Sequence, residues 1–170
     1  MKPLMMAAMA ALAFSAAAVP ASAHEATPAP AQASASRTPT EAENARIVVA
    51  FYDLAFNQHR PTEAARLYIG DRYIQHNPDV PNGAEPFYAY FEGFFRDNPQ
   101  SRATIHRVIA DGDLVALHVH SQETPDDPGR AIVDIFRVEN GKIVEHFDVI
   151  QPVPPATANG NTMFSGDRAD

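Results

Sequence analysis

Two histidines and one aspartate on neighbouring predicted strands form the most reactive group in this sequence. Side chains alternate between the two faces of a strand, so His118 and His120 share one face. Asp134 lies on the next strand in an apolar row that contains Ile132 and Phe136. A carboxylate in apolar surroundings is costly unless it is partnered, and imidazoles across a strand pair could partner it. Such a trio favours metal-free proton transfer at a carbon next to a carbonyl, the alternative being surface groups on a solvated face.

Asp148 is a second carboxylate on a predicted strand. Asn140 and Gly141 are the signature of a two-residue hairpin loop, which fixes the register of the flanking strands. A regular ladder then places Asp134 opposite Phe147, and Asp148 points to the other face. Unless a bulge intervenes, only one aspartate lines a cavity. We assign that place to Asp134 and a structural role to Asp148.

Four further side chains are candidates for ligand binding. His76 and Asn77 follow a short predicted strand, where turn formation explains an asparagine equally well. At a cavity rim, their imidazole and amide could instead bind a carbonyl oxygen. Phe91 lies on a predicted aromatic helix face and Phe136 on a strand, as either core or pocket wall. An aromatic wall favours an apolar or flat ligand.

A metal site is not predicted. Gly112 followed by His118 and His120 resembles the opening of the cupin metal motif, but the glutamate and the second half of that motif are not at the expected positions. His106 and His146 are interpreted as exposed or simply hydrogen-bonded strand residues. We therefore expect neither a metal nor another cofactor.

Three helices are expected in the first part of the folded chain. Thr40 and Glu43 match a capping box, and apolar residues recur after them at helical spacing. Pro61 stands at the first position of a short second helix that ends near Gly70. The third helix spans about residues 84–97 and carries the aromatic face.

The second part of the folded chain is predicted to form β-strands. After a brief strand at 73–76, the predicted strands are 105–110, 114–120, 132–138 and 143–150. Helices followed by a meander predict an α+β domain, with three N-terminal helices packed on a strongly curved antiparallel sheet around a cone-shaped cavity.

The two ends of the chain differ from this domain. Residues 1–23 have the basic start, apolar middle and small-residue exit of a secretory signal, with cleavage expected after Ala23. Residues 24–39 are predicted to be a disordered linker, 40–153 the domain and 154–170 a tail. The expected location is the periplasm or the exterior.

Composition excludes several functions. The 170 residues contain 13 basic and 21 acidic side chains, for a formal charge of −8, which disfavours binding to nucleic acid or an anionic membrane. There is no cysteine, so thiol catalysis and disulfides are excluded.

Several stretches resemble the SnoaL-like polyketide cyclases of the NTF2-like superfamily, and in particular a subgroup predicted to catalyse aldol condensation. The resemblance covers about residues 40 to 164, and the matching stretches are 51–57, 73–78, 98–101, 112–115, 133–137, 141–146 and 159–164. The resemblance implies an NTF2-like cone, a cofactor-independent reaction and pairing through the open sheet face as a homodimer. It also implies that Asp134 is the acid–base residue, that His120 assists it and that His118 is a polar neighbour.

The first hypothesis is therefore an exported lyase or isomerase of the aldol or enolisation type acting on a small apolar or aromatic carbonyl compound. Asp134 would remove the proton while His120 and His118 hydrogen-bond the enolate. The alternatives are a non-catalytic periplasmic module that binds a small hydrophobic ligand, and a dimeric interaction domain with a filled pocket.

Overall fold

The computed structural model describes residues 37–164. The predicted signal peptide, nearly all of the predicted linker and the last six residues of the tail lie outside the described residues. None of the helices in the described part has the length and apolar character needed to cross a membrane.

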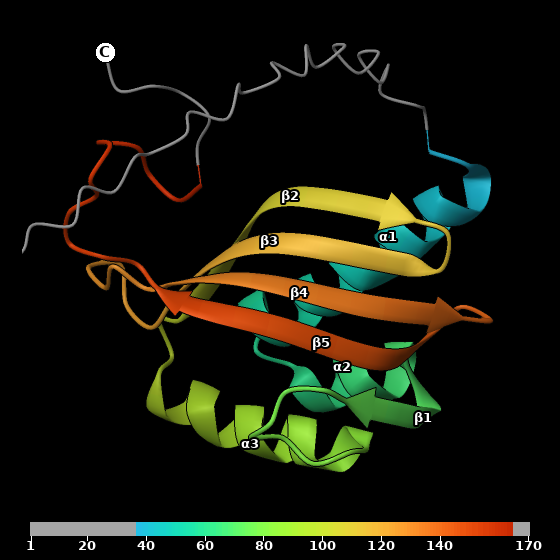
Figure 1. Cartoon of the computed structure of the whole chain (residues 1–170). Helices are drawn as coiled ribbons and strands as arrows, with labels where there is room; N and C mark the ends of the chain where they lie inside the picture. The colour runs from blue at the N-terminus through green and yellow to red at the C-terminus, as the bar shows by residue number, and fades with distance from the viewer. Residues whose placement is uncertain (1–36, 165–170) are drawn as a thin grey trace, which may run out of the picture. The chain divides into compact units, whose positions relative to one another are not determined.

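The described part of the chain contains three α-helices, one π-helical turn and a five-stranded sheet (Figure 1). In chain order the elements are α1 Pro39–Tyr52, η1 Asp53–Asn57, α2 Pro61–Tyr68, β1 Ile69–Gln75, α3 Ala84–Asp97, β2 Arg102–Asp111, β3 Leu114–Gln122, β4 Arg130–Glu139 and β5 Lys142–Pro152. The strands are ordered β1-β5-β4-β3-β2 across the sheet.

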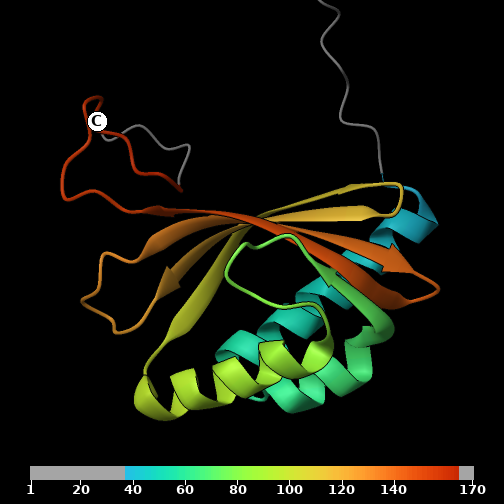
Figure 2. The same cartoon turned by 60° about the horizontal axis from the view of Figure 1, so that its bottom comes forward.

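The helices cover one face of the twisted sheet, which we call the inner face, and within residues 37–164 no helix lies on the opposite or outer face (Figure 2). This is the predicted α+β architecture of three helices on a curved sheet. One detail of the prediction is wrong: β1 is longer than expected and pairs parallel to β5, so the sheet is mixed rather than antiparallel. The sheet is open between its edge strands β1 and β2.

The first helix begins two residues earlier than the capping pattern predicted. Thr38 is the N-cap, its hydroxyl accepts a hydrogen bond from the Glu41 backbone N–H, and the Glu41 carboxylate accepts one from Thr38 N. Pro39 occupies the first helical position, where its missing N–H has no cost. Thr40 and Glu43 match the same spacing but lie inside the helix.

A π-helical turn follows α1 directly. The Gln58 backbone N–H bonds the carbonyl of Asp53 at 3.0 Å, one residue farther back than in an α-helix. Tyr52, at the end of α1, and Phe56, in the turn, lie with ring centroids 4.3 Å apart. Both side chains line the same cavity, described below.

The core lies between α1 and the inner face of the central strands. Val115, Leu117 and Val119 on β3 are fully buried, and so are Val48 and Phe51 on α1. Their burial stabilises the fold by roughly 25 cal/mol for each Å² of apolar surface removed from water. It also fixes which face of β3 is the inner one.

The β4–β5 hairpin determines where the reactive side chains lie. Asn140 and Gly141 both have positive φ (50° and 75°), as a two-residue loop of this type requires, and this confirms the predicted turn. The pairing then shifts by one residue between Arg137 and Val138, because Val144 forms a bulge. Every residue of β5 beyond the bulge therefore points to the face opposite to the one that a regular ladder predicts.

Candidate functional site

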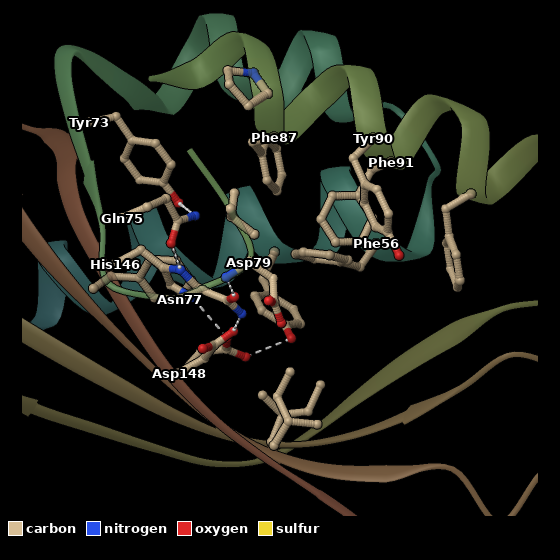
Figure 3. Close-up of a pocket in the computed structure, with 18 of the residues that line it drawn as sticks. Phe56, Tyr73, Gln75, Asn77, Asp79, Phe87, Tyr90, Phe91, His146 and Asp148 are labelled. Carbon is tan, nitrogen blue, oxygen red and sulfur yellow. Dashed lines mark hydrogen bonds and ion pairs between the residues drawn. The ribbon is translucent and has the colours of Figure 1, made fainter. Parts of the chain in front are cut away.

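A cavity of about 420 Å³ lies between the inner face of the sheet, the C-terminal end of α1 and the helix α3. The loop that connects β1 to α3 contributes Asn77, Asp79 and Val80 to its rim. Figure 3 shows one wall of aromatic side chains facing a floor of polar groups. The volume is within the range of small-molecule sites.

Asp134 lies at the floor of this cavity and is 5% exposed. Its Oδ2 accepts a hydrogen bond from the Tyr52 hydroxyl at 2.8 Å, and its Oδ1 lies 3.0 Å from His146 Nε2. A buried carboxylate is costly without such partners, and here one partner comes from α1 and the other from the neighbouring strand. The predicted pocket position of Asp134 agrees with this structure, whereas its catalytic role stays a prediction.

The hydrogen bonds of His146 define its protonation. Gln75 directs its amide nitrogen to the Tyr73 hydroxyl at 3.4 Å, so its carbonyl oxygen faces His146 Nδ1 at 2.9 Å (Figure 3). Nδ1 therefore carries a proton, and Nε2 faces Asp134. A 3.0 Å contact between Nε2 and a carboxylate oxygen requires one more proton between them. Asp134 and His146 thus form a pair that shares a proton inside the cavity.

Asp148 lies opposite Asp134 in the β4–β5 ladder, on the same face. The predicted pairing of Asp134 with Phe147 is wrong, because the bulge at Val144 shifts the register by one residue. Asp148 Oδ2 accepts a hydrogen bond of 2.7 Å from Asn77 Nδ2. The structural role assigned to Asp148 therefore does not account for its position in the cavity.

The wall opposite these carboxylates is aromatic. Phe87 and Phe91 on α3 pack against Phe56 with ring centroids 6.1 and 4.9 Å away. Tyr90, 64% exposed, lies at the rim. Phe136 lines the cavity from β4, as Phe91 does from α3, and their role as ligand contacts stays a prediction.

His118 and His120 lie on the outer face, away from the cavity. Asp134 pairs with Leu117, which is buried on the inner face, so the two histidines between the buried positions of β3 point outward. The predicted trio of His118, His120 and Asp134 is wrong for this reason. The side chain that meets Asp134 is His146, which the sequence interpretation treated as an ordinary strand residue.

The outer histidines form a cluster of their own. The β2–β3 register shifts at His106, and its ring lies 6.3 and 6.5 Å from those of His118 and His120. Phe164 from the C-terminal segment stacks on this group, with centroids 4.2 Å from His120 and 4.9 Å from His106. Arg107 donates hydrogen bonds to His118 Nδ1 and to the Phe164 carbonyl, at 2.9 and 2.8 Å.

His76 also lies outside the cavity. Its Nε2 is 2.9 Å from Glu145 Oε1, and its ring stacks on Phe147 at 4.0 Å, both residues of the outer face. Its predicted partner Asn77 does line the cavity. These two adjacent residues therefore lie on different sides: the Asn77 side chain lines the cavity, and the His76 side chain lies on the outer face of the sheet.

Burial and charge keep the tyrosines of the floor protonated. Burial raises the pKa of Tyr52 well above its usual value, and the charge of Asp134 and the hydrogen bond to it raise it further. Burial likewise raises the pKa of Tyr73, with smaller effects of Asp134 and Asp148. Both hydroxyls therefore remain protonated at neutral pH.

Sequence reasoning missed Tyr52, Gln75 and His146. Tyr52 follows Phe51 in a helix and resembles a core residue, and Gln75 lies within the short strand predicted at 73–76. A signal for His146 was available in its alternation with Asp148, since residues two apart on a strand share a face.

The same floor could hold a cation. Asp134, His146 and Asp148 offer ligand atoms that all lie within 4.8 Å of one another. In the described part of the chain this is the one group of three such side chains at that spacing. The hydrogen bonds within the group also satisfy its members without an ion.

The fold and the cavity are those of the NTF2-like class, in which a curved sheet and three helices enclose a pocket. A SnoaL-like domain model matches residues 48–146, and the chain belongs to this family. No curated protein matches the chain in sequence.

Many solved structures share the fold. One is predicted to be a SnoaL-like polyketide cyclase, from Jannaschia sp. CCS1, with a TM-score of 0.57, 18% identity and coverage of 68% of this chain and 90% of that one. A SnoaL-like protein of unknown function from Burkholderia thailandensis has a TM-score of 0.56 and 18% sequence identity, with coverage of 67% of this chain and 99% of that one. An NTF2-like protein of unknown function from Mesorhizobium loti has a TM-score of 0.56 and 20% sequence identity, with coverage of 68% of this chain and 97% of that one. At these identities the likeness extends to the fold alone.

Proposed function

We propose that this protein is a cofactor-independent acid–base enzyme of the aldol or enolisation type that acts on a small aromatic or apolar carbonyl compound. The observation that supports the proposal is the proton-sharing pair of Asp134 and His146 at the floor of an aromatic cavity. A general base must reach its substrate by hydrogen-bond distance, and a carboxylate in a cavity meets that requirement.

In the proposed reaction, Asp134 accepts the proton from the carbon next to the carbonyl. The electrons of the broken C–H bond form the C=C bond of the enolate, and the π electrons of the carbonyl move to its oxygen. His146 balances the charge of Asp134 through their 3.0 Å contact. Tyr52 donates its one hydroxyl hydrogen to Asp134, and once Asp134 has accepted the substrate proton that hydrogen can instead be donated to the enolate oxygen. These roles replace those first expected for His120 and His118.

The test is exchange of the substrate's α-hydrogen for deuterium in D₂O, followed by NMR over a panel of aryl ketones. Asp134→Asn should keep the fold and lower the exchange rate by about 10²–10⁴-fold, the usual cost of losing a general base. The matched control is Asp111→Asn, which removes the same charge at an exposed position at the end of β2.

Two outcomes would contradict the proposal. Full exchange activity in Asp134→Asn together with its loss in Asp148→Asn would show that the base is Asp148 and not Asp134. Binding of the ketones without exchange by the wild-type protein would favour the alternative, a module that only binds a small hydrophobic ligand.

The proposal is metal-free. Elemental analysis should find no stoichiometric transition metal, and chelators should leave the melting temperature unchanged. One metal per chain, lost in His146→Ala, would overturn this part, because His146 belongs to the group that could hold a cation.

Export and pairing are further parts of the proposal. Export is supported by residues 1–23, and intact-mass analysis of the exported protein should place its N-terminus at His24. A homodimer through the outer face is supported by its exposed apolar side chains Ile109, Val133 and Val149. Light scattering should report a molecular mass of two chains, and the Val149→Asp variant should have the mass of a single chain.

A further inference from the structure

The carboxylates of the cavity are unequally compensated. Asp134 has two partners, the Tyr52 hydroxyl and the His146 imidazole. Asp148 is half-buried, and among residues 37–164 its recorded partner is the neutral amide of Asn77, at 2.7 Å. No lysine, arginine or histidine of that part of the chain forms an ion pair with it within 4.0 Å. Asp148 therefore has no ion-pair partner of its own within this distance: the imidazole of His146 lies within 4.8 Å of it but makes its 3.0 Å contact with Asp134.

The pairing of the two strands increases this excess. Asp134 and Asp148 are direct cross-strand partners, and like charges at such positions destabilise a sheet. His146 can balance one of the two, and it contacts Asp134. A second positive charge near Asp148 would relieve the remaining repulsion.

The other charged groups that line the cavity do not supply that charge. Asp79 adds a third carboxylate at the rim. Arg130 is the one lining residue with a permanent positive charge, but it is exposed and lies 3.2 Å from Glu123. The cavity lining thus carries more negative than positive charge.

Aromatic rings complete a surface suited to a cation. Phe87, Tyr90 and Phe91 line the cavity from α3, while Asp148 and Asn77 lie across from them (Figure 3). Ring faces attract an organic cation and also pack against an apolar ring. A ligand with a flat ring and a charged amine would satisfy both sides at once.

We infer that the cavity selects ligands in which an amine cation is attached to a flat apolar ring, with the amine bound by Asp148 and the ring packed against α3. Only the statement that such an amine is also the substrate rests on the proposed function. The selection itself concerns binding and can be measured without any reaction.

The experiment compares three probes with the same ring and different head groups: 2-phenylethylamine, 2-phenylethanol and 3-phenylpropionate. Binding is measured by calorimetry at neutral pH with a chelator present. The amine should bind at least about tenfold more tightly than the alcohol, as expected for a charge-assisted hydrogen bond, and the carboxylate most weakly.

Two variants locate this preference. Asp148→Asn should reduce the advantage of the amine over the alcohol to about twofold or less, whereas Asp111→Asn should keep it. Asp148→Glu, which retains the charge, should keep most of it. Unchanged binding of the alcohol to Asp148→Asn serves as the check that this variant is folded.

Equal binding of amine and alcohol by the wild-type protein would overturn the inference, and so would tightest binding of the carboxylate or an amine preference that survives in Asp148→Asn. These results leave the deuterium-exchange test of Asp134 unaffected. Conversely, an amine preference without α-hydrogen exchange would support the inference and contradict the enzymatic proposal.

Discussion

The histidine side chains on the two faces of the sheet have different neighbours. On the inner face, His146 is 8% exposed and contacts a carboxylate, an amide oxygen and the ring of Phe136. On the outer face, His106, His118 and His120 contact one another, the ring of Phe164 and the guanidinium of Arg107. The same residue type therefore contacts a buried carboxylate on one face and packs against Phe164 on the other.

Neighbouring charge explains this difference. Partial burial lowers the pKa of His118, and the charge of Arg107 lowers it further. The pKa of His106 is lowered by burial first and then by His118 and His120. His106 and His118 on the outer face thus favour neutral rings, whereas the inner 3.0 Å contact of His146 is with a carboxylate oxygen. The reactive face is recognised by what a histidine contacts and not by how many histidines it holds.

The largest expected difference between the faces is in stability. Leu117→Ala removes a fully buried inner side chain and should destabilise the fold by about 2–5 kcal/mol. Ile109→Ala removes the same number of carbons from an outer position that is 62% exposed, and should change stability by about 0.5 kcal/mol or less. Urea titration of both variants measures the difference, and similar losses would contradict the assignment of faces.

A smaller effect is expected at the floor of the cavity. Tyr52→Phe removes the hydroxyl that supports buried Asp134, and should destabilise the protein by about 1–3 kcal/mol. The matched control is Tyr90→Phe, because the Tyr90 side chain is largely exposed at the rim and its change should have no measurable effect. Thermal melts at neutral pH compare the two, and an equal shift would show that the bond to Asp134 adds nothing.

The smallest effect concerns the pH dependence of the outer cluster. Because the pKa values of His106 and His118 are lowered in the folded state, the unfolded chain binds protons at higher pH. Their contribution to stability is therefore present above the unfolded pKa of about 6.5 and falls as the pH drops toward the lower folded values. These side chains are largely solvated, so the contribution should be under about 1 kcal/mol.

The double variant His106→Asn/His118→Asn tests this sign. Its melting temperature should fall less than that of the wild-type protein between about pH 7.5 and pH 5.5, on either side of the ordinary histidine pKa. A steeper fall in the variant would mean that the outer histidines stabilise the fold in their charged form.

Much of the fold could be predicted from local patterns. Pro61 and the aromatic spacing of 84–97 define α2 and α3, and the Asn140-Gly141 pair defines the β4–β5 turn, because each signal lies within one element. The parallel pairing of β1 with β5 was not predicted, since it joins segments about 70 residues apart. Gly70 enables this approach, because a Cβ there would lie 3.3 Å from Val144 Cγ1.

The site could be predicted only in part, for two physical reasons. First, the bulge at Val144 reverses the face of His146 and Asp148. The adjacent apolar pair Ile143 and Val144 does not reveal it in the sequence, because Val149 and Ile150 form a second such pair in the same strand. Second, the inner face of β3 is defined by the bulky row at 115, 117 and 119. The prediction instead chose the face by the reactivity of His118 and His120.

The central claim is that the acid–base centre contains His146 on the inner face and neither of the outer histidines. It is tested most directly by the rate of α-hydrogen exchange in His146→Gln and His120→Gln, measured side by side by NMR on one aryl ketone. His146→Gln should lower the rate by about tenfold or more, and His120→Gln should leave it within about twofold of wild type. Loss of exchange in His120→Gln with full activity in His146→Gln would contradict the account.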